Sequence, residues 1–340
     1  MPTFCRHGRF LERCPVCSKD LSGNRPGGRA APRPKRAAGR TASGSATGAG
    51  RRVRGKPMRI HREGRAEDDG YRNSLVPGVR ASADAARLAE EIAFASGRLL
   101  GLAVDPPGLY SEAVEAIPVD LERATWICFL TAYLSPLDDG EDPFAGIRAA
   151  LQAMPGMDAP IAVEALSEPG AIALGPRTSH DRTRGAETLD AYRQWVARAG
   201  GSQASAFAGD EAWTPERRFE RLFERLALPG FGRMGRYELL VTLGRLGVHR
   251  LSADSLHLGG VRGASSEEAT IVAAKRVFGI GDPLLLDRRA AALAAAVAVP
   301  VEALDLALAN WAEPARATMG FPAQTADDGA HERAFDALIE

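Results

Sequence analysis

The run GPRTSHDRTRG holds the side chains most suggestive of chemistry in the main part of the chain. Arg177, Arg182 and Arg184 carry guanidinium groups, which bind phosphate oxygens in pairs. His180 and Asp181 lie between them, and such side chains accept and donate protons near neutral pH. The loop therefore predicts phosphate binding together with proton transfer. A solvated basic loop with an Asp–Arg pair explains the same residues equally well.

Four metal-binding side chains lie within the first 17 residues, in CRHGRFLERCPVC. Cys5 and His7 form a Cys-x-His pair, and Cys14 and Cys17 form a Cys-x-x-Cys pair. Three thiolates and one imidazole are the ligand set of a closed structural zinc site. We expect a zinc-binding knuckle over residues 1–21. A redox Cys-x-x-Cys is the alternative, which no thioredoxin-like βαβ pattern supports.

The net charge of zero conceals two oppositely charged parts of the chain. Residues 1–65 contain 17 Lys and Arg against three Asp and Glu, so the remaining residues carry the opposite excess. Residues 22–80 are rich in Gly, Pro and Arg and hold few large apolar side chains, which predicts a disordered basic linker. Such a linker fits a polyanionic partner, most simply DNA, although simple solvation of a tail is the alternative.

Two amphipathic helices joined by a glycine turn organise the rest of the sequence. Thr214 is a favourable N-cap and Pro215 suits the first helical position. The apolar residues that follow recur at helical spacing, and Pro229 ends the first helix. Gly230 and Gly232 then allow a tight turn before a second helical pattern begins.

The sequence of this turn, LPGFG, resembles the hairpin of helix-hairpin-helix DNA-binding proteins, including the DNA glycosylases. Backbone N–H groups of Gly230, Phe231 and Gly232 would approach a DNA phosphate, helped by the positive end of the second helix. Arg233 and Arg236 would reinforce that contact. An ordinary helix–helix corner, with no role in DNA binding, is the alternative.

Helical patterns also begin at Ser82 and after Asp120, and no alternating strand pattern persists in the main domain. We therefore predict an all-α domain over residues 81–325 followed by a tail, 326–340. Cys128 lies within an apolar helical stripe, which predicts a buried and inert thiol. Neither a signal peptide nor a membrane-spanning run is evident, so we expect a cytoplasmic, nucleoid-associated protein.

Helix-hairpin-helix glycosylases carry a catalytic Asp about twenty residues beyond the hairpin, and Asp254 occupies that place. The resemblance implies a carboxylate that stabilises positive charge or activates a nucleophile, with His257 one helical turn further on. Asp254 as the N-cap of a short helix is the alternative. Bifunctional members use a Lys where this chain has Met234, so Schiff-base chemistry is not expected.

Residues of about 85–312 resemble a narrower family, the α-glutamyl/putrescinyl thymine pyrophosphorylases. The likeness lies in FLTAYLSPLDDGEDPFAGIRAAL, GPRTSHD, the hairpin run and KRVFGIGDPLLLDRRAAALA. It implies that an amine or amino acid replaces pyrophosphate on a 5-pyrophosphoryloxymethyl-uracil in DNA. The loop arginines, and His257 near them, would bind phosphate, while Asp254, His180 or Asp181 would handle protons. A DNA glycosylase and a non-catalytic DNA-binding protein are the other two possibilities.

Overall fold

The computed structural model describes residues 66–168, 170–259 and 268–339, and the structural statements below concern these residues. All described residues belong to one compact unit. The predicted zinc ligands Cys5, His7, Cys14 and Cys17 lie outside the described residues, as does the predicted linker up to residue 65.

Regular structure in the described residues is helical throughout, without a strand, which confirms the all-α prediction for this part of the chain. None of these helices is long and apolar enough to cross a membrane. The same residues contain no cluster of three or more His, Cys, Asp or Glu side chains placed to hold a metal ion.

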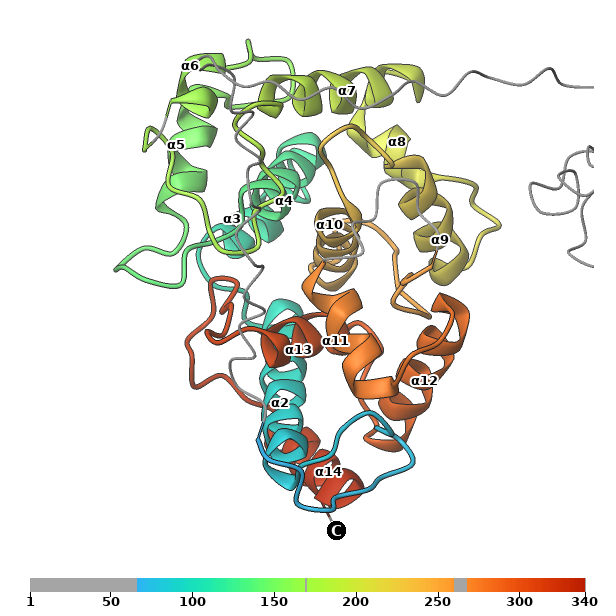
Figure 1. Cartoon of the computed structure of the whole chain (residues 1–340). Helices are drawn as coiled ribbons and strands as arrows, with labels where there is room; N and C mark the ends of the chain where they lie inside the picture. The colour runs from blue at the N-terminus through green and yellow to red at the C-terminus, as the bar shows by residue number, and fades with distance from the viewer. Residues whose placement is uncertain (1–65, 169, 260–267, 340) are drawn as a thin grey trace, which may run out of the picture. The chain divides into compact units, whose positions relative to one another are not determined.

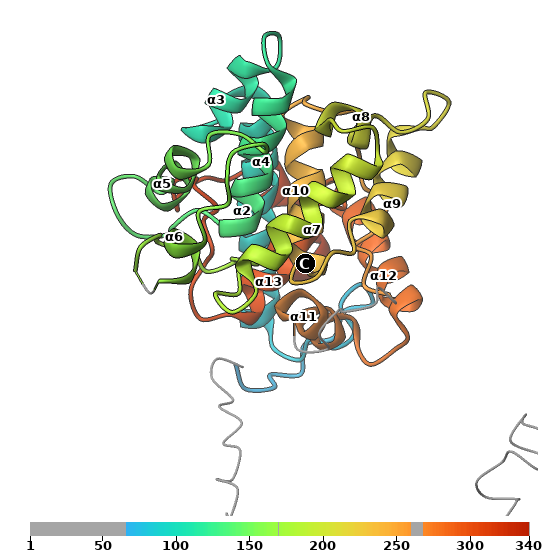
Figure 2. The same cartoon turned by 90° about the horizontal axis from the view of Figure 1, so that it is seen from above.

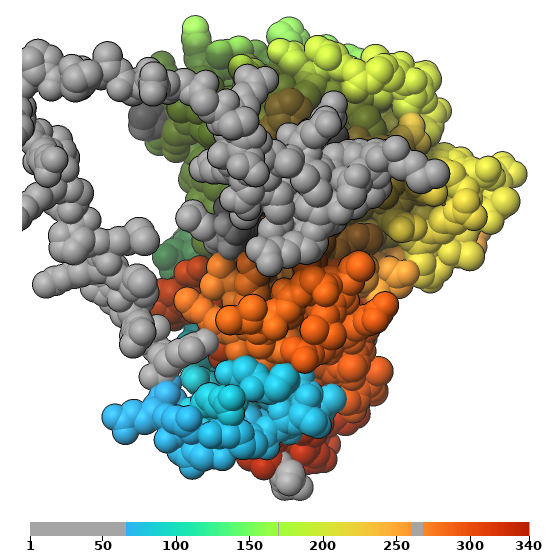
Figure 3. Space-filling view, turned by 45° about the vertical axis from the view of Figure 1, so that its right-hand side comes forward, coloured from blue at the N-terminus to red at the C-terminus, as the bar shows by residue number. Residues whose placement is uncertain are grey.

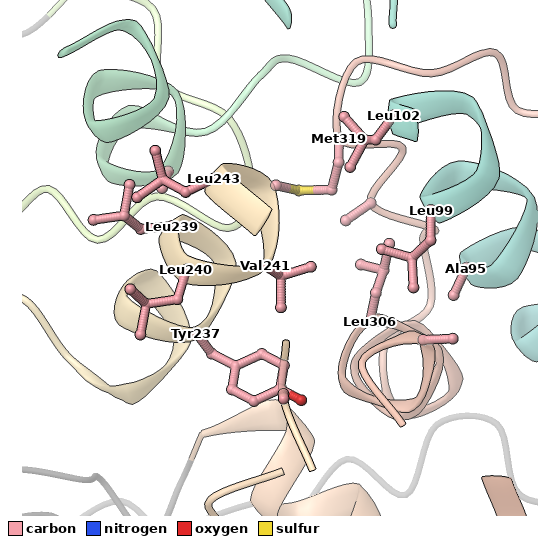
Figure 4. Packing of buried hydrophobic residues seen from close by; sticks show 14 of the residues in the cluster. Ala95, Leu99, Leu102, Tyr237, Leu239, Leu240, Val241, Leu243, Leu306 and Met319 are labelled. Carbon is pink, nitrogen blue, oxygen red and sulfur yellow. The ribbon is translucent and has the colours of Figure 1, made fainter. Parts of the chain in front are cut away.

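Three helices, α2 (Ser82–Val104), α10 (Arg233–Arg245) and α13 (Ala303–Ala312), enclose the centre of the core. Figure 4 shows Leu99 of α2 and Leu306 of α13 facing Val241 of α10. The predicted apolar stripe of α2 is buried, as expected for a helix whose apolar residues recur every three to four positions.

Helix α4 (Leu121–Leu134) forms a second part of the core and is buried on nearly all sides. Asp120 caps it as predicted, because its carboxylate accepts the N–H of Arg123 at 2.9 Å. Cys128 is fully buried, and burial raises the pKa of its thiol well above the ordinary range. The prediction of an inert thiol is therefore confirmed.

Further helices surround this core. Figure 1 shows α5, α6 and α7 at the end of the body away from α14, and Figure 2 looks onto these three helices from above. The bounds of the surrounding helices are α3 (Leu109–Ala116), α5 (Ala145–Ala153), α6 (Val163–Ser167), α7 (Gly185–Arg198) and α8 (Gln203–Ala208).

Helices α9 (Pro215–Arg225) and α10 flank the glycine turn, in agreement with the pattern of the sequence. Thr214 caps α9 by accepting the N–H of Arg217, and Pro215 occupies the first turn. The αL backbone of Gly230, with φ of 72°, reverses the chain. A Cβ at Gly230 would lie 2.3 Å from Oγ1 of Thr188, so only glycine allows α7 to approach so closely.

Two segments assigned to linker and tail belong to the folded body instead. Residues 66–80 bury Val76 and Val79, and the N–H of Gly78 donates to the carbonyl oxygen of Val277 at 2.9 Å. Figure 3 shows this blue segment beneath the orange surface of α11 (Ala269–Phe278) and α12 (Pro283–Ala296). The predicted tail contains helix α14 (Asp328–Ile339), which packs against α2. The few apolar side chains of these two segments are therefore enough to pack both of them against the helices of the body.

Candidate functional site

The segment after α10, residues 248–259, carries Asp254 and is held in place on both sides of it. The N–H of Ala253 donates to Glu302 at 3.0 Å, and the hydroxyl of Tyr237 donates to the carbonyl oxygen of Ser255 at 3.1 Å. Leu256 is fully buried. Asp254 itself is exposed, so a fixed backbone presents its carboxylate to solvent.

No helix begins at Asp254 within residues 248–259, so the N-cap interpretation is wrong. His257 is consequently not one helical turn away, and its φ of 51° turns the ring inward onto Phe223, with ring centroids 4.5 Å apart. Burial lowers the pKa of His257 to about 4, although the negative charge of Asp254 opposes this effect. His257 is therefore neutral at physiological pH and packs against the core.

Four charged side chains form a buried cluster beside this segment, which we call the arginine–carboxylate cluster: Arg177, Arg233, Glu268 and Asp305. Asp305 accepts from Nη2 of Arg177 at 2.8 Å and from Nη2 of Arg233 at 2.5 Å. Nη1 of Arg233 donates to Glu268 at 2.5 Å. Two cations and two anions balance, which is how charges survive in a protein interior.

Opposite charges within the cluster decide which groups stay ionised. Burial raises the pKa of Asp305, but Arg233 and Arg177 outweigh burial and hold that pKa below its ordinary value. Burial raises the pKa of Glu268, which has Arg233 as its partner but lies nearer the surface. Asp305 is therefore the fixed anion of the cluster, and two guanidinium groups are oriented around it.

A chain of hydrogen bonds connects the polar loop to the Asp254 segment. Arg177 and Arg233 share Asp305, and Arg233 also donates to the carbonyl oxygen of Leu256 through Nε at 3.1 Å and Nη2 at 2.8 Å. The loop also approaches the first turn of α10, where a Cβ at Gly235 would lie 2.2 Å from Oγ of Ser179. The structure thus brings Arg177 and Asp254 into one connected region.

The other predicted residues of the polar loop point in different directions. His180 is buried, and both ring nitrogens are occupied: Nδ1 lies 2.8 Å from the hydroxyl of Tyr133 and Nε2 lies 2.9 Å from the carbonyl oxygen of Leu166. A carbonyl can only accept, so Nε2 carries the proton and Nδ1 accepts from Tyr133. Burial lowers the pKa of His180, which keeps the ring neutral.

Asp181, Arg182 and Arg184 lie on the outer side of the loop. Asp181 accepts from the backbone and hydroxyl of Thr183, and these hydrogen bonds lower the pKa of its carboxyl group. Arg182 donates to the carbonyl oxygen of Glu168 at 2.5 Å. Arg184 is exposed immediately before α7. The three loop arginines therefore do not converge on one point in this conformation.

The side chains of the glycine turn face the interior. Phe231 is 1% exposed and packs against Phe129, with ring centroids 5.6 Å apart. Arg233 and Arg236 are equally buried, so the expectation that they reinforce a phosphate contact is wrong. Arg236 donates to the carbonyl oxygen of Phe223 at 3.0 Å, and burial lowers the pKa of its guanidinium group to about 10.

Backbone groups remain available at the turn. A Cβ at Gly232 would meet no atom within 4 Å, so this position faces open space at the start of α10. No side chain caps this helix, which leaves the N–H groups of its first turn free of a side-chain partner among the described residues.

Residues 177–320 match the family model described as alpha-glutamyl/putrescinyl thymine pyrophosphorylase clade 3. This part of the chain is similar to that family. The matched range begins at Arg177 and contains Asp254 and Asp305, so it includes the whole chain of hydrogen bonds described above. No curated protein and no solved structure matches the chain.

Sequence reasoning missed Asp305, Glu268 and Asp287. Asp287 accepts the N–H of Leu258 at 3.2 Å and so fixes the far end of the Asp254 segment. A signal existed for Asp305, because it is the single charged residue in the apolar run ALDLALANW of α13. A lone carboxylate at such a position indicates a buried partner, but the pattern does not say which arginine provides it.

Proposed function

We propose that this protein binds DNA and replaces the pyrophosphate of a 5-pyrophosphoryloxymethyl-uracil with an amine. The observation that carries the proposal is the family match over residues 177–320, which spans the polar loop, the glycine turn and the Asp254 segment. The name of the matched family joins a thymine, a pyrophosphate and glutamyl or putrescinyl groups. These are the three components of such a substitution.

The reaction needs a nucleophile, a leaving group and a proton acceptor. The amine nitrogen donates its lone pair to the methylene carbon attached to C5 of the base. The carbon–oxygen bond breaks, and pyrophosphate leaves with the bonding electrons. The new C–N bond leaves an excess proton on nitrogen, which a base removes.

Asp254 is the better candidate for that base. Its carboxylate is exposed on a segment that Glu302 and Asp287 hold from either side. Both nitrogens of His180 are occupied within the fold, and His257 is stacked on Phe223. We therefore assign His180 and His257 positioning roles.

The leaving pyrophosphate would meet the guanidinium groups at the outer side of the polar loop. Arg184 is exposed, and Arg182 is engaged only by the carbonyl oxygen of Glu168 among the described residues. Arg177 is held by Asp305, so we assign it the positioning of the loop against α10. Asp181, already in a turn with Thr183, would orient this loop rather than transfer protons.

DNA would be held by backbone groups at the glycine turn and by the basic N-terminal residues. The open position at Gly232 lets a phosphate reach the N–H groups at the start of α10. Residues 1–65 add a large positive charge that attracts DNA without reading its sequence. We further propose that Cys5, His7, Cys14 and Cys17 bind a structural zinc ion.

Release of pyrophosphate from DNA carrying 5-pyrophosphoryloxymethyl-uracil tests the proposal. Asp254→Asn keeps the shape of the side chain but cannot take a proton, and we expect at least about 100-fold slower release. Asp139→Asn, in an exposed loop after α4, is the matched control and should react as the unaltered protein does. Equal rates for the two variants would exclude Asp254 as the base.

A DNA glycosylase is the second candidate, favoured by an exposed carboxylate at the place after the hairpin where glycosylases carry theirs. It would release a free base and leave an abasic site without releasing pyrophosphate. Measuring both products in one reaction separates the two activities.

A further inference from the structure

The turn between α11 and α12 presents apolar side chains to solvent. Ile280 is 97% exposed and Leu284 is 69% exposed, whereas most large apolar side chains of the described residues are buried. Gly279 and Gly281 flank Ile280, so the side chain stands alone at the tip of the turn. These two side chains stay in water and so gain little from folding, and an exposed apolar patch is a feature of surfaces that bind a partner.

Positive charges surround these apolar side chains. Lys275 and Arg276 lie in the last turn of α11, and Arg288 lies in α12. All three are exposed, and none of the ion pairs found among the described residues includes them. Asp282, an exposed acid two residues after Ile280, accepts the N–H of Leu285 and caps α12. Cations around an apolar tip complement a polyanion with an apolar interior.

The turn lies beside the Asp254 segment. Asp287 of α12 accepts the N–H of Leu258, and a Cβ at Gly259 would lie 3.1 Å from Cβ of Pro283. Ile280 and Leu284 are therefore close in sequence to residues that touch the candidate site. A DNA duplex bound for reaction near Asp254 would pass this turn.

The described segment 66–80 runs next to the same turn. A Cβ at Gly78 would lie 2.0 Å from the carbonyl oxygen of Arg276 and 3.0 Å from the backbone nitrogen of Gly279. Ala66 and Gly78 line one cavity of about 230 Å³. Residue 66, the first that the structure describes, therefore lies in the same part of the surface as Gly78.

We infer that the α11–α12 turn is a DNA wedge: Ile280, supported by Leu284, enters the base stack while Lys275, Arg276 and Arg288 hold phosphates. The inference rests on the proposed action on a base in DNA, because a base within a duplex must leave the stack to react. Apolar wedges that open a base step are a known means of doing so. The aromatic residues nearest the glycine turn cannot serve, since Phe231 and Tyr237 are each 1% exposed.

Fluorescence of a duplex containing one 2-aminopurine tests the wedge, because this base brightens when it is unstacked. We expect the full-length protein to raise the signal and Ile280→Ala to remove most of the rise. Val119→Ala is the matched control, since Val119 is 87% exposed in the turn between α3 and α4. Equal signals for the two variants would overturn the wedge. If the unaltered protein sediments as a dimer without DNA and Ile280→Ala sediments as a monomer, the turn is a contact between two copies and the wedge is overturned.

The binding of phosphates by the three cations has an independent readout. The logarithm of the DNA-binding constant falls with the logarithm of the salt concentration. Replacing Lys275, Arg276 and Arg288 together by Ala should make this slope shallower by about 3, because each phosphate that is no longer neutralised removes close to one unit. An unchanged slope would contradict the assignment. Circular dichroism of each variant is the control that checks whether the fold is retained.

The wedge and the proposed reaction can fail separately. If the protein unstacks the duplex through Ile280 but releases no pyrophosphate, the wedge stands and the proposed function fails. If pyrophosphate is released and Ile280→Ala behaves as Val119→Ala does, only the wedge fails.

Discussion

Two glycine turns of the same form, Gly-Phe-Gly at 230–232 and Gly-Ile-Gly at 279–281, each connect a pair of helices but differ in the direction of their side chains. Phe231 of the first turn is buried, whereas Ile280 of the second is exposed. The arginines of the first turn enter the core, and the cations of the second remain in solvent. In the proposed complex, the first turn would therefore contact DNA through its backbone and the second through its side chains.

The largest expected difference between the turns lies in their arginines. Arg233→Ala leaves Asp305 with one partner and Glu268 with none, so we expect the free energy of unfolding to fall by about 3 to 5 kcal/mol. Arg276→Ala at the second turn should change it by less than about 0.5 kcal/mol. Urea denaturation measures both values. Similar losses would contradict the contrast between buried and exposed cations.

The central apolar residues should follow the same order. Phe231→Ala opens a cavity beside Phe129, and we expect unfolding to become easier by about 3 kcal/mol. Ile280→Ala removes a side chain that is almost wholly in water and should change stability by less than about 0.5 kcal/mol. If Ile280→Ala proved as destabilising as Phe231→Ala, the second turn would be packed against the protein.

The first turn also has a buried histidine, His257, among its neighbours. The pKa of His257 is about 4 when folded and about 6.5 when unfolded, so the unfolded chain binds more protons between these values. The free energy of unfolding is therefore unaffected by this histidine above about pH 6.5, and it falls as the pH falls from there towards 4. We expect a loss of about 1 to 3 kcal/mol.

His257→Asn tests this pH dependence, since asparagine cannot take the proton and tolerates positive φ. Stability of the variant should fall less steeply between pH 7 and pH 4 than that of the unaltered protein. Parallel curves would show that His257 does not contribute.

The smallest expected effect is a change in DNA affinity, and it tests whether a phosphate contacts the backbone of the first turn. Gly232→Asp supplies a good N-cap for α10, so the fold should be kept while the carboxylate repels a phosphate. Gly232→Asn is the neutral control. We expect the Asp variant to bind duplex DNA about 3- to 10-fold more weakly than the Asn variant. Equal affinities of the two variants, measured by fluorescence anisotropy, would show that no DNA phosphate binds at this turn.

Features fixed by neighbouring residues were predictable from the sequence. The caps at Asp120 and Thr214, the stop at Pro229 and the apolar stripe of α2 depend on contacts within a turn or two of helix. These predictions agree with the structure.

Features fixed by distant residues were not predictable. Arg233 turns inward because Asp305, 72 residues away, provides a buried anion. The Asp254 segment looked like a helix start, but Glu302 and Asp287 hold its backbone without a helix. Residues 66–80 looked like linker because their partners lie in distant helices: Gly78 bonds to Val277 of α11 and Tyr71 to Leu338 of α14. A single sequence does not reveal such pairings.

Mass spectrometry of nucleosides and small products tests the central claim most directly. The full-length protein is incubated with DNA carrying 5-pyrophosphoryloxymethyl-uracil, with and without amines such as putrescine and glutamate. The account predicts a base that gains the mass of the amine, together with one released pyrophosphate for each base changed. A free base with an abasic site, or bound DNA without any product, would contradict it.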